Sequence, residues 1–206
     1  MVRSIMLNEH QNLSFRNEHK YILSLEQYTY LKQHLECIQA PHKYIVNSIY
    51  FDTSSLSSYQ EKADGDWKKI KLRQRWYGNN APFFEIKYKE GNKNKKYRFD
   101  NLQKAHTFMS SLSSATQLFH STKQVHVRYL REGYQLSENL RITFDSELIY
   151  QDLVHGHSST RLIYIMEIKG KETPEWVKAF CHCINITPAR FSKYADSLKA
   201  LRSKIV

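Results

Sequence analysis

The sequence is poor in the residues that interrupt regular structure, with six glycines and four prolines among 206 residues. That scarcity excludes a collagen-like chain, and the aromatic content of 13% argues against a disordered one. No run approaches the roughly 18 apolar residues of a membrane-spanning helix, and Met1–Leu7 is too short and too polar for a secretory signal. We therefore expect a cytosolic protein without a membrane segment, folded as one domain over residues 1–206.

Cysteine is also scarce, and the three cysteines match no zinc or disulfide pattern. Cys37 stands alone, while Cys181 and Cys183 are two residues apart, a spacing that points their side chains away from each other on a helix. The expectation is three reduced thiols, which agrees with a cytosolic location.

Carboxylates are few beside the cations, 20 Asp and Glu against 31 Lys and Arg, which gives a net charge of +11. The segment Asp66–Arg98 alone holds 11 Lys and Arg against three Asp and Glu, a net charge of +8. Aromatic and aliphatic residues are interleaved with these charges, so the segment can fold. Most of the excess charge therefore belongs to one structured region and not to a basic tail.

The interleaving in this region has a period of two, which is typical of a strand with two different faces. Every odd position of residues 69–75 is cationic, and residues 84–89 keep the same parity with Glu85 at the head of the charged face. Residues 77–82 read as a hairpin loop between the two strands. Two adjacent strands therefore share a basic face.

The same alternation recurs along the chain and predicts seven or eight strands, the others lying at residues 15–21, 44–52, 125–129, 140–145 and 164–169. Helical spacing of apolar residues predicts helices at residues 24–38, 53–62, 102–112, 173–184 and 192–204. The fold class is α+β. A charged sheet face can lie in water, or it can line a closed barrel and bind a multiply charged anion while the helices cover the outside.

Seven segments in order resemble the VTC domain of polyphosphate polymerases, and the resemblance runs from Phe15 to about Leu198. The segments are residues 16–21, 48–53, 72–78, 85–87, 141–145, 166–169 and 190–194. The resemblance implies a triphosphate tunnel metalloenzyme related to the CYTH phosphatases, with a closed eight-stranded antiparallel barrel. It also implies transfer of the γ-phosphate of ATP, or of another nucleoside triphosphate, to a polyphosphate chain with Mn²⁺ or Mg²⁺.

The resemblance assigns phosphate binding to seven cations: Lys20, Arg73, Arg75, Lys87, Arg128, Arg141 and Lys193. Three further cations alternate onto the charged faces of their strands but match the family segments less closely: Lys71, Arg98 and Lys169. Among these residues we expect Lys193, Arg73 and Arg75 to act in catalysis. Glu167 resembles the metal ligand. Glu18, Glu85 and Asp145 could ligate metal or pair with basic side chains.

One departure concerns the ExExK motif of the related phosphatases, where Arg16 replaces the first Glu and leaves Glu18 as the acidic member. This replacement weakens the case for a hydrolytic centre with two metal ions. The chain length leaves no room for the additional domains of larger VTC proteins, so a free-standing domain is expected.

Three functions remain open: a polyphosphate polymerase, a tripolyphosphate or nucleoside triphosphate hydrolase, and a polyanion-binding module without catalysis. Nucleic acid is a poor candidate partner, because Trp76 and Tyr88 fall on the parity opposite to the charges.

Overall fold

The computed structural model describes residues 17–63, 67–91, 93–112, 118, 120–170 and 175–202. The elements in chain order are β1 (Asn17–Leu23), α1 (Leu25–Ile38), β2 (His42–Asp52), α2 (Ser57–Ala63), β3 (Lys68–Tyr77), β4 (Phe83–Glu90), β5 (Lys93–Phe99), α3 (Leu102–Ser110), β6 (Thr122–Ser137), β7 (Leu140–Asp152), β8 (Ser158–Arg161), β9 (Tyr164–Gly170), α4 (Glu175–Cys183) and α5 (Lys193–Arg202). The expected strand residue Arg16 and the expected helix start at Thr173 and Pro174 lie outside the described residues.

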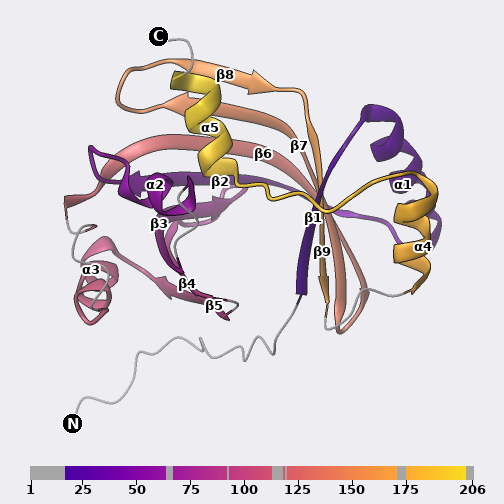
Figure 1. Ribbon diagram of the computed structural model, residues 1–206, viewed down its shortest axis with the longest axis horizontal. Helices are drawn as coiled ribbons and strands as arrows, with labels where there is room; N and C mark the ends of the chain where they lie inside the picture. The colour runs from indigo at the N-terminus through magenta and orange to yellow at the C-terminus, as the bar shows by residue number, and fades with distance from the viewer. Residues whose placement is uncertain are drawn as a thin grey trace.

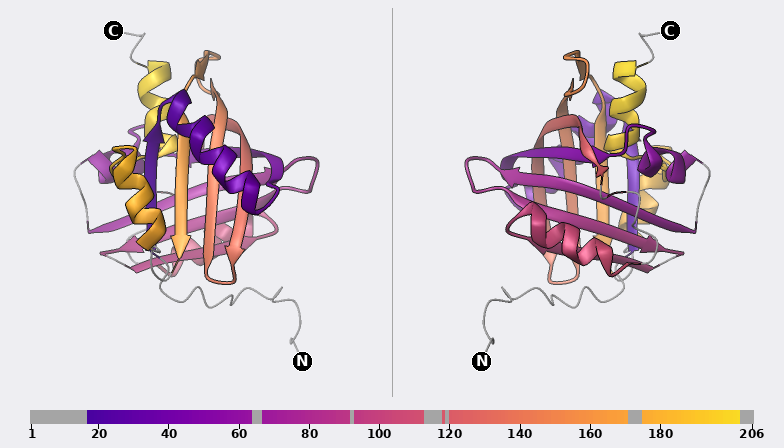
Figure 2. Two further views of the ribbon diagram at one scale, coloured as in Figure 1. Left: turned by 90° about the vertical axis from the view of Figure 1, so that its right-hand side faces the viewer. Right: turned by 90° about the vertical axis from the view of Figure 1, so that its left-hand side faces the viewer.

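The strands form one strongly curved antiparallel sheet, in which β1, β9, β7 and β6 cross the direction of β2, β3, β4 and β5 (Figures 1 and 2). The strand order is β1-β9-β7-β6-β2-β3-β4-β5, and β8 pairs with β7 as an extra strand. The α+β class and the antiparallel sheet of eight main strands are confirmed.

The expected closure of the barrel is wrong, because no pairing joins β5 to β1 among the described residues. Closure would bring the edges to the ~4.8 Å spacing of paired strands. Desolvation, and after it the charge of Lys169 on β9 next to β1, lower the pKa of Lys96 on β5. These like charges, one on the edge strand β5 and one on the strand beside β1, oppose closure and favour an open, curled half-barrel.

Three of the helices cover the convex side of the sheet as expected. α1 and α4 pack over β1, β9, β7 and β6 around the buried Leu35, Phe144 and Val177, and Figure 2 shows both helices lying on these strands. α3 packs over β3, β4 and β5 around Leu72 and Met109. In each case one apolar strand face is buried against one apolar helix face, which leaves the other face of the strand free for charge.

α5 departs from this plan because it packs against the concave face, which corrects the expectation that all helices lie outside. Its Tyr194 and Leu198 join Tyr50 and Tyr129 in one apolar cluster. A register shift between β6 and β7 accompanies Glu147, whose φ of 52° is unusual for a residue other than glycine. The concave face is therefore apolar under α5 and charged beside it.

Candidate functional site

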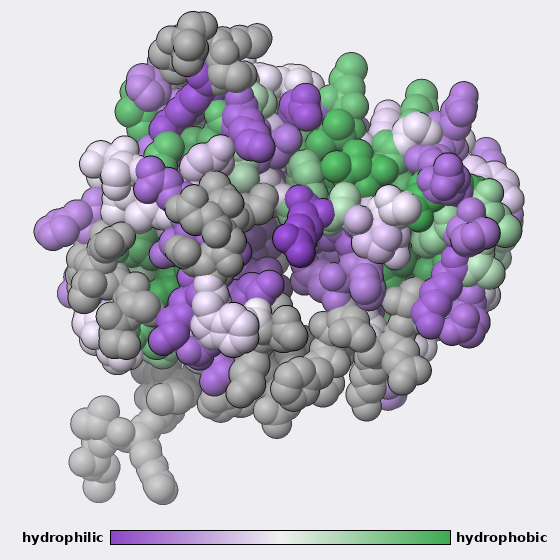
Figure 3. Space-filling model, in the orientation of Figure 1, coloured by the Kyte–Doolittle hydropathy of each residue, from purple (hydrophilic) through white to green (hydrophobic). Residues whose placement is uncertain are grey.

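The concave face encloses a cavity of about 630 Å³ beside the N-terminus of α5. In the space-filling view hydrophilic side chains gather around the central hollow (Figure 3). Twelve cations line the cavity: Lys20, Lys69, Lys71, Arg73, Arg75, Lys87, Lys89, Lys96, Arg131, Lys169, Arg190 and Lys193. Two carboxylates, Glu18 and Glu167, line it with them. The lining thus has a net of ten positive charges, close to the whole chain's +11.

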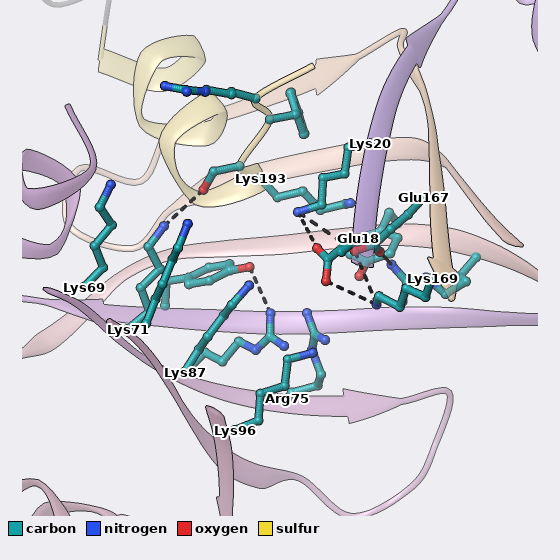
Figure 4. Close-up of a pocket in the computed structure, with 18 of the residues that line it drawn as sticks. Glu18, Lys20, Lys69, Lys71, Arg75, Lys87, Lys96, Glu167, Lys169 and Lys193 are labelled. Atoms are coloured by element: carbon teal, nitrogen blue, oxygen red, sulfur yellow. Dashed lines mark hydrogen bonds and ion pairs between the residues drawn. The ribbon is translucent and has the colours of Figure 1, made fainter. Parts of the chain in front are cut away.

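One wall of the cavity is a row of like charges across β3, β4 and β5. Lys71 is paired in register with Lys87, and Lys87 with Lys96 (Figure 4). Desolvation and the charge of Lys169 lower the pKa of Lys96 to about 7, and desolvation also lowers the pKa of Lys87. Like charges directly opposite each other destabilise a sheet, so this wall is best stabilised by a bound anion.

The next row of the same sheet holds a carboxylate between two arginines. The Arg73 guanidinium donates to Glu85, which is 2% exposed, and Arg98 lies 3.6 Å from the other oxygen of Glu85. Burial opposes ionisation of Glu85, but Arg73 and Arg75 outweigh it and lower its pKa to about 2. Glu85 is therefore a buried counter-charge that holds Arg73 in a fixed orientation at the cavity wall.

Tyr50 contacts the same arginine from β2. Arg73 lies 3.4 Å from the Tyr50 hydroxyl oxygen, to which it donates, and Tyr50 is 7% exposed. Burial alone would raise the pKa of Tyr50, but Arg73, Arg75 and Lys193 together lower it to about 8. Even a neutral phenol in this cavity is thus biased towards its anion.

A second buried carboxylate holds two cations on the opposite side of the cavity. Arg131 on β6 donates two hydrogen bonds to Asp145, at 2.6 and 2.7 Å, and Lys193 Nζ lies 2.5 Å from the same carboxylate. Asp145 is completely buried, and burial raises its pKa less than Arg131 and Lys193 lower it. The first residue of α5 is therefore tied to β6 and β7 by an ion-paired triad.

The two cavity carboxylates lie together on β1 and β9 (Figure 4). Lys20 Nζ lies 3.0 Å from Glu18 and 3.9 Å from Glu167, and Lys169 Nζ lies 3.9 Å from Glu18 and 3.3 Å from Glu167. Burial opposes ionisation of Glu167, but Lys169 and its other neighbours hold its pKa well below the usual range. Glu18 and Glu167 thus both present carboxyl oxygens at one end of the cavity.

Nine of the residues predicted as site residues come together in this cavity: Glu18, Lys20, Lys71, Arg73, Arg75, Lys87, Glu167, Lys169 and Lys193. Arg98, Arg128 and Arg141 do not line it. Arg98 is at the exposed sheet edge, 4.8 Å from the Phe83 ring. Arg128 alternates with the cavity residue Tyr129 and so faces the convex side, while Arg141 donates to the Tyr44 hydroxyl, 2.8 Å away, beyond the cavity.

Sequence reasoning gave no role to several of the cavity residues. Lys96 is on β5, whose mostly charged sequence shows no alternation that would have marked it. Arg131 shares the parity of Tyr129, the strand face opposite the predicted ligand Arg128, so alternation pointed away from it. Nothing in the sequence marked Tyr50 as a cavity residue except its place in residues 48–53, one of the segments that resemble the VTC domain. Glu85 and Asp145, which could have been metal ligands, are found in ion pairs.

Within the described ranges, no group of three or more His, Cys, Asp and Glu side chains could hold a metal ion. No helix of this part of the chain is long and apolar enough to cross a membrane.

A family model of the VTC domain matches residues 15–202. Similar solved structures include the PH1819 protein of Pyrococcus horikoshii, with a TM-score of 0.55, 14% identity and coverage of 92% of this chain and 99% of that chain. A putative adenylyl cyclase of Hippeastrum, described as having a dominant triphosphatase activity, has a TM-score of 0.54 and 16% identity, covering 87% of this chain and 93% of that one. A putative adenylate cyclase of Bacillus halodurans has a TM-score of 0.53 and 13% identity, covering 87% and 96%. A search of curated proteins found no match.

Proposed function

Because the chain belongs to the VTC domain family, we propose that its cavity binds a nucleoside triphosphate and a polyphosphate chain and transfers the γ-phosphoryl group between them. In this reaction an oxygen at the end of the chain bonds to the γ-phosphorus, and the bond from that phosphorus to the bridging oxygen breaks. The products are a nucleoside diphosphate and a chain longer by one phosphate. A cytosolic location would give access to nucleoside triphosphates.

The observation that carries this proposal is the charge of the cavity, twelve cations against two carboxylates. Several of these cations lie directly opposite one another across the strands. A single triphosphate would neutralise only part of this lining, whereas a triphosphate together with a run of chain phosphates would neutralise most of it. Phosphoryl transfer needs positioned cations more than covalent help from the protein.

The proposed division of roles follows from how each cation is held. Arg73 and Arg131 are fixed by the buried Glu85 and Asp145, so their planar guanidinium groups can bind phosphate oxygens in pairs at defined positions. Lys193, held at the first residue of α5 by Asp145, supplies a point charge to the reacting phosphate. Arg75, whose Nε donates to the Ser48 hydroxyl at 2.9 Å, is oriented beside them.

One end of the cavity offers two carboxylates to a divalent cation, Mn²⁺ or Mg²⁺, and the remaining ligands would come from the substrate. Glu18 and Glu167 offer carboxylate oxygens there, and both also pair with Lys20 and Lys169. Mg²⁺ is commonly held by one or two carboxylates together with substrate phosphates, so these two residues would hold the ion with a substrate present. When bound, such an ion neutralises charge on the phosphoryl group that is transferred.

Hydrolysis of tripolyphosphate or a nucleoside triphosphate is the second candidate. It is favoured by the Hippeastrum protein of the same fold, which is described as having a dominant triphosphatase activity. The same cations would serve both reactions, and the acceptor distinguishes them, since a hydrolase positions water where a polymerase positions a chain end.

One assay separates these functions. The purified protein is incubated with ATP and Mn²⁺ or Mg²⁺, and polyphosphate, free phosphate and tripolyphosphate are resolved over time. Chain growth supports the polymerase, and phosphate release without chains supports the hydrolase. Binding of tripolyphosphate without either product supports a binding module.

Two variants and one control relate the result to the cavity. We expect Lys87→Ala and Glu167→Gln each to reduce product formation by at least tenfold, because one removes a central cation and the other a carboxylate donor. Arg128→Ala removes a cation of the same sheet outside the cavity and should leave the rate within about twofold, as surface substitutions do. Equal losses in all three variants would contradict the cavity as the site.

A further inference from the structure

Trp67 is an exposed aromatic residue at the rim of the cavity. It comes immediately before β3 and is 72% exposed, yet its side chain is part of the cavity lining. The other large aromatic residues of the lining are more enclosed: Tyr50 and Tyr129 are buried, at 7% and 1%, and Phe191 is partly buried. Among the described cavity residues, Trp67 alone thus offers a widely open ring.

The indole ring is supported from one side by Gly91. A Cβ atom added at Gly91 would lie 2.5 Å from Trp67 Cζ2 and 2.6 Å from Cη2, so only glycine allows the ring to lie this close to the backbone. Gly91 N–H also donates to the Trp67 carbonyl at 2.9 Å, and the φ of Gly91 is +56°. The contact with Gly91 covers one part of the ring and leaves the rest open.

The position of the ring relates it to the cations deeper in the cavity. Trp67 immediately precedes β3 and has the parity of Lys69 and Lys71, and all three side chains line the cavity. Lys69 is paired in register with Lys89 of β4, and both line the cavity. At ~3.3 Å per residue, Lys71 lies about 13 Å along the chain from Trp67. An aromatic ring thus stands at the mouth, and pairs of cations follow inward.

We propose that Trp67 stacks on the base of a nucleotide whose phosphates lie among the lysines of β3 and β4. The inference rests on the proposed function and specifies its donor, a nucleoside triphosphate in place of inorganic tripolyphosphate. Stacking on the face of the indole does not distinguish one base from another, because every base has a π-face. The site therefore accepts adenine and guanine nucleotides alike.

The test compares two ligands that each carry three phosphates, of which only one carries a base. Binding of the non-hydrolysable β,γ-imido analogue of ATP and of tripolyphosphate is measured by calorimetry in the wild type and in Trp67→Ala. Loss of one stacking contact weakens binding by roughly tenfold, so we expect that loss for the nucleotide and a change within about twofold for tripolyphosphate. Trp67→Phe, which keeps an aromatic ring, should restore most of the nucleotide affinity.

Trp76 provides the matched control, since it is on the same strand but stacks on His126 outside the cavity. Trp76→Phe should leave both affinities unchanged. A Trp76→Phe/Trp176→Phe double variant leaves Trp67 as the remaining tryptophan of the three. Its fluorescence should be quenched by the ATP analogue and by the matching GTP analogue, and not by tripolyphosphate.

The failures of the two proposals can be told apart. If Trp67→Ala weakens both ligands equally, or neither, the stacking role is overturned while tripolyphosphate binding by the wild type still supports the cavity. If the wild type binds neither ligand, the proposed function is overturned together with the stacking role.

Discussion

Lys96 should couple the binding of a polyanion to the uptake of a proton. In the ligand-free protein, desolvation and the neighbouring Lys169 lower the pKa of Lys96 to about 7, against an ordinary value of 10.5. Above pH 7 the folded protein therefore increasingly holds Lys96 neutral. A bound triphosphate favours the charged ammonium, so binding raises this pKa again and draws a proton from the buffer.

The sign of the pH dependence follows from linkage. Below pH 7, Lys96 is already charged, and binding involves no proton at this residue. Between about pH 7 and pH 10.5 binding takes up at most one proton, so affinity falls by at most tenfold per pH unit. Because Lys96 is exposed to solvent, screening weakens the coupling, and we expect the affinity to fall by roughly threefold per pH unit.

Calorimetry measures both quantities. The affinity for tripolyphosphate is determined between about pH 6 and about pH 9, and the protons taken up are counted from the difference between two buffers of unlike ionisation enthalpy. Lys96→Met should lower the affinity at pH 6 and flatten the pH dependence that remains after the ligand's own titration is subtracted.

Lys95→Met is the matched control, because Lys95 precedes Lys96 on β5 and alternation places its side chain on the other face of the sheet. It should keep the wild-type pH dependence. An unchanged pH dependence in Lys96→Met, or an affinity that rises with pH in the wild type, would refute the reasoning.

Three further predictions concern the charges of the cavity wall and the buried carboxylates. Lys87→Met should stabilise the ligand-free protein by about 0.5 kcal/mol, since it relieves like charges across the strands, and it should reduce the stabilisation by tripolyphosphate in a thermal shift assay. Asp145→Asn should destabilise the fold by about 3 kcal/mol in urea unfolding, because Arg131 and Lys193 lose their buried counter-charge. Glu85 should contribute stability that is complete above its ordinary pKa of 4.5 and is lost as pH falls towards about 2, so acid unfolding of Glu85→Gln should depend less on pH in this window.

The Lys87 and Asp145 predictions each have a matched comparison. Arg128→Met removes a cation outside the cavity and should leave the thermal shift with tripolyphosphate unchanged. Asp100→Asn breaks an ion pair with Lys104 that solvent screens, and should change stability in urea far less than Asp145→Asn does. A Lys87→Met protein that binds tripolyphosphate as tightly as the wild type would show that the row of lysines is not a binding surface.

Much of the site was predictable because alternation is a local property of the sequence. The four odd positions of residues 69–75 lie on one face in the structure as the pattern indicated, and all four line the cavity. β5 and β8 were missed, since β5 (Lys93–Phe99) is mostly charged and β8 (Ser158–Arg161) has only four residues. Short or uniformly polar segments show too little contrast between faces for alternation to reveal a strand.

Other features depend on contacts between distant segments, and no local pattern encodes them. Closure of a barrel depends on whether the edges of β1 and β5 pair, and α5 packs inside because its apolar face meets β6 and β7. The partners of Glu85 and Asp145 come from other strands and from α5, so the choice between ion pair and metal ligand required the structure.

Some cavity cations are held by ion pairs and others are not, and this difference matters for a substrate that must move through the cavity. Arg73 and Arg131 are clamped by buried carboxylates, whereas no ion pair within hydrogen-bonding reach appears for Lys87 or Lys96 among the described residues. A polymer that grows by one unit must advance by one unit before the next transfer. An unpaired lysine side chain can change rotamer and keep its contact with a phosphate that moves, whereas an arginine held by a buried carboxylate cannot. If the proposed polymerase reaction takes place here, Arg73 and Arg131 would hold the reacting phosphate in place while Lys87 and Lys96 follow the moving chain, and release from the two arginines would limit the step between successive transfers.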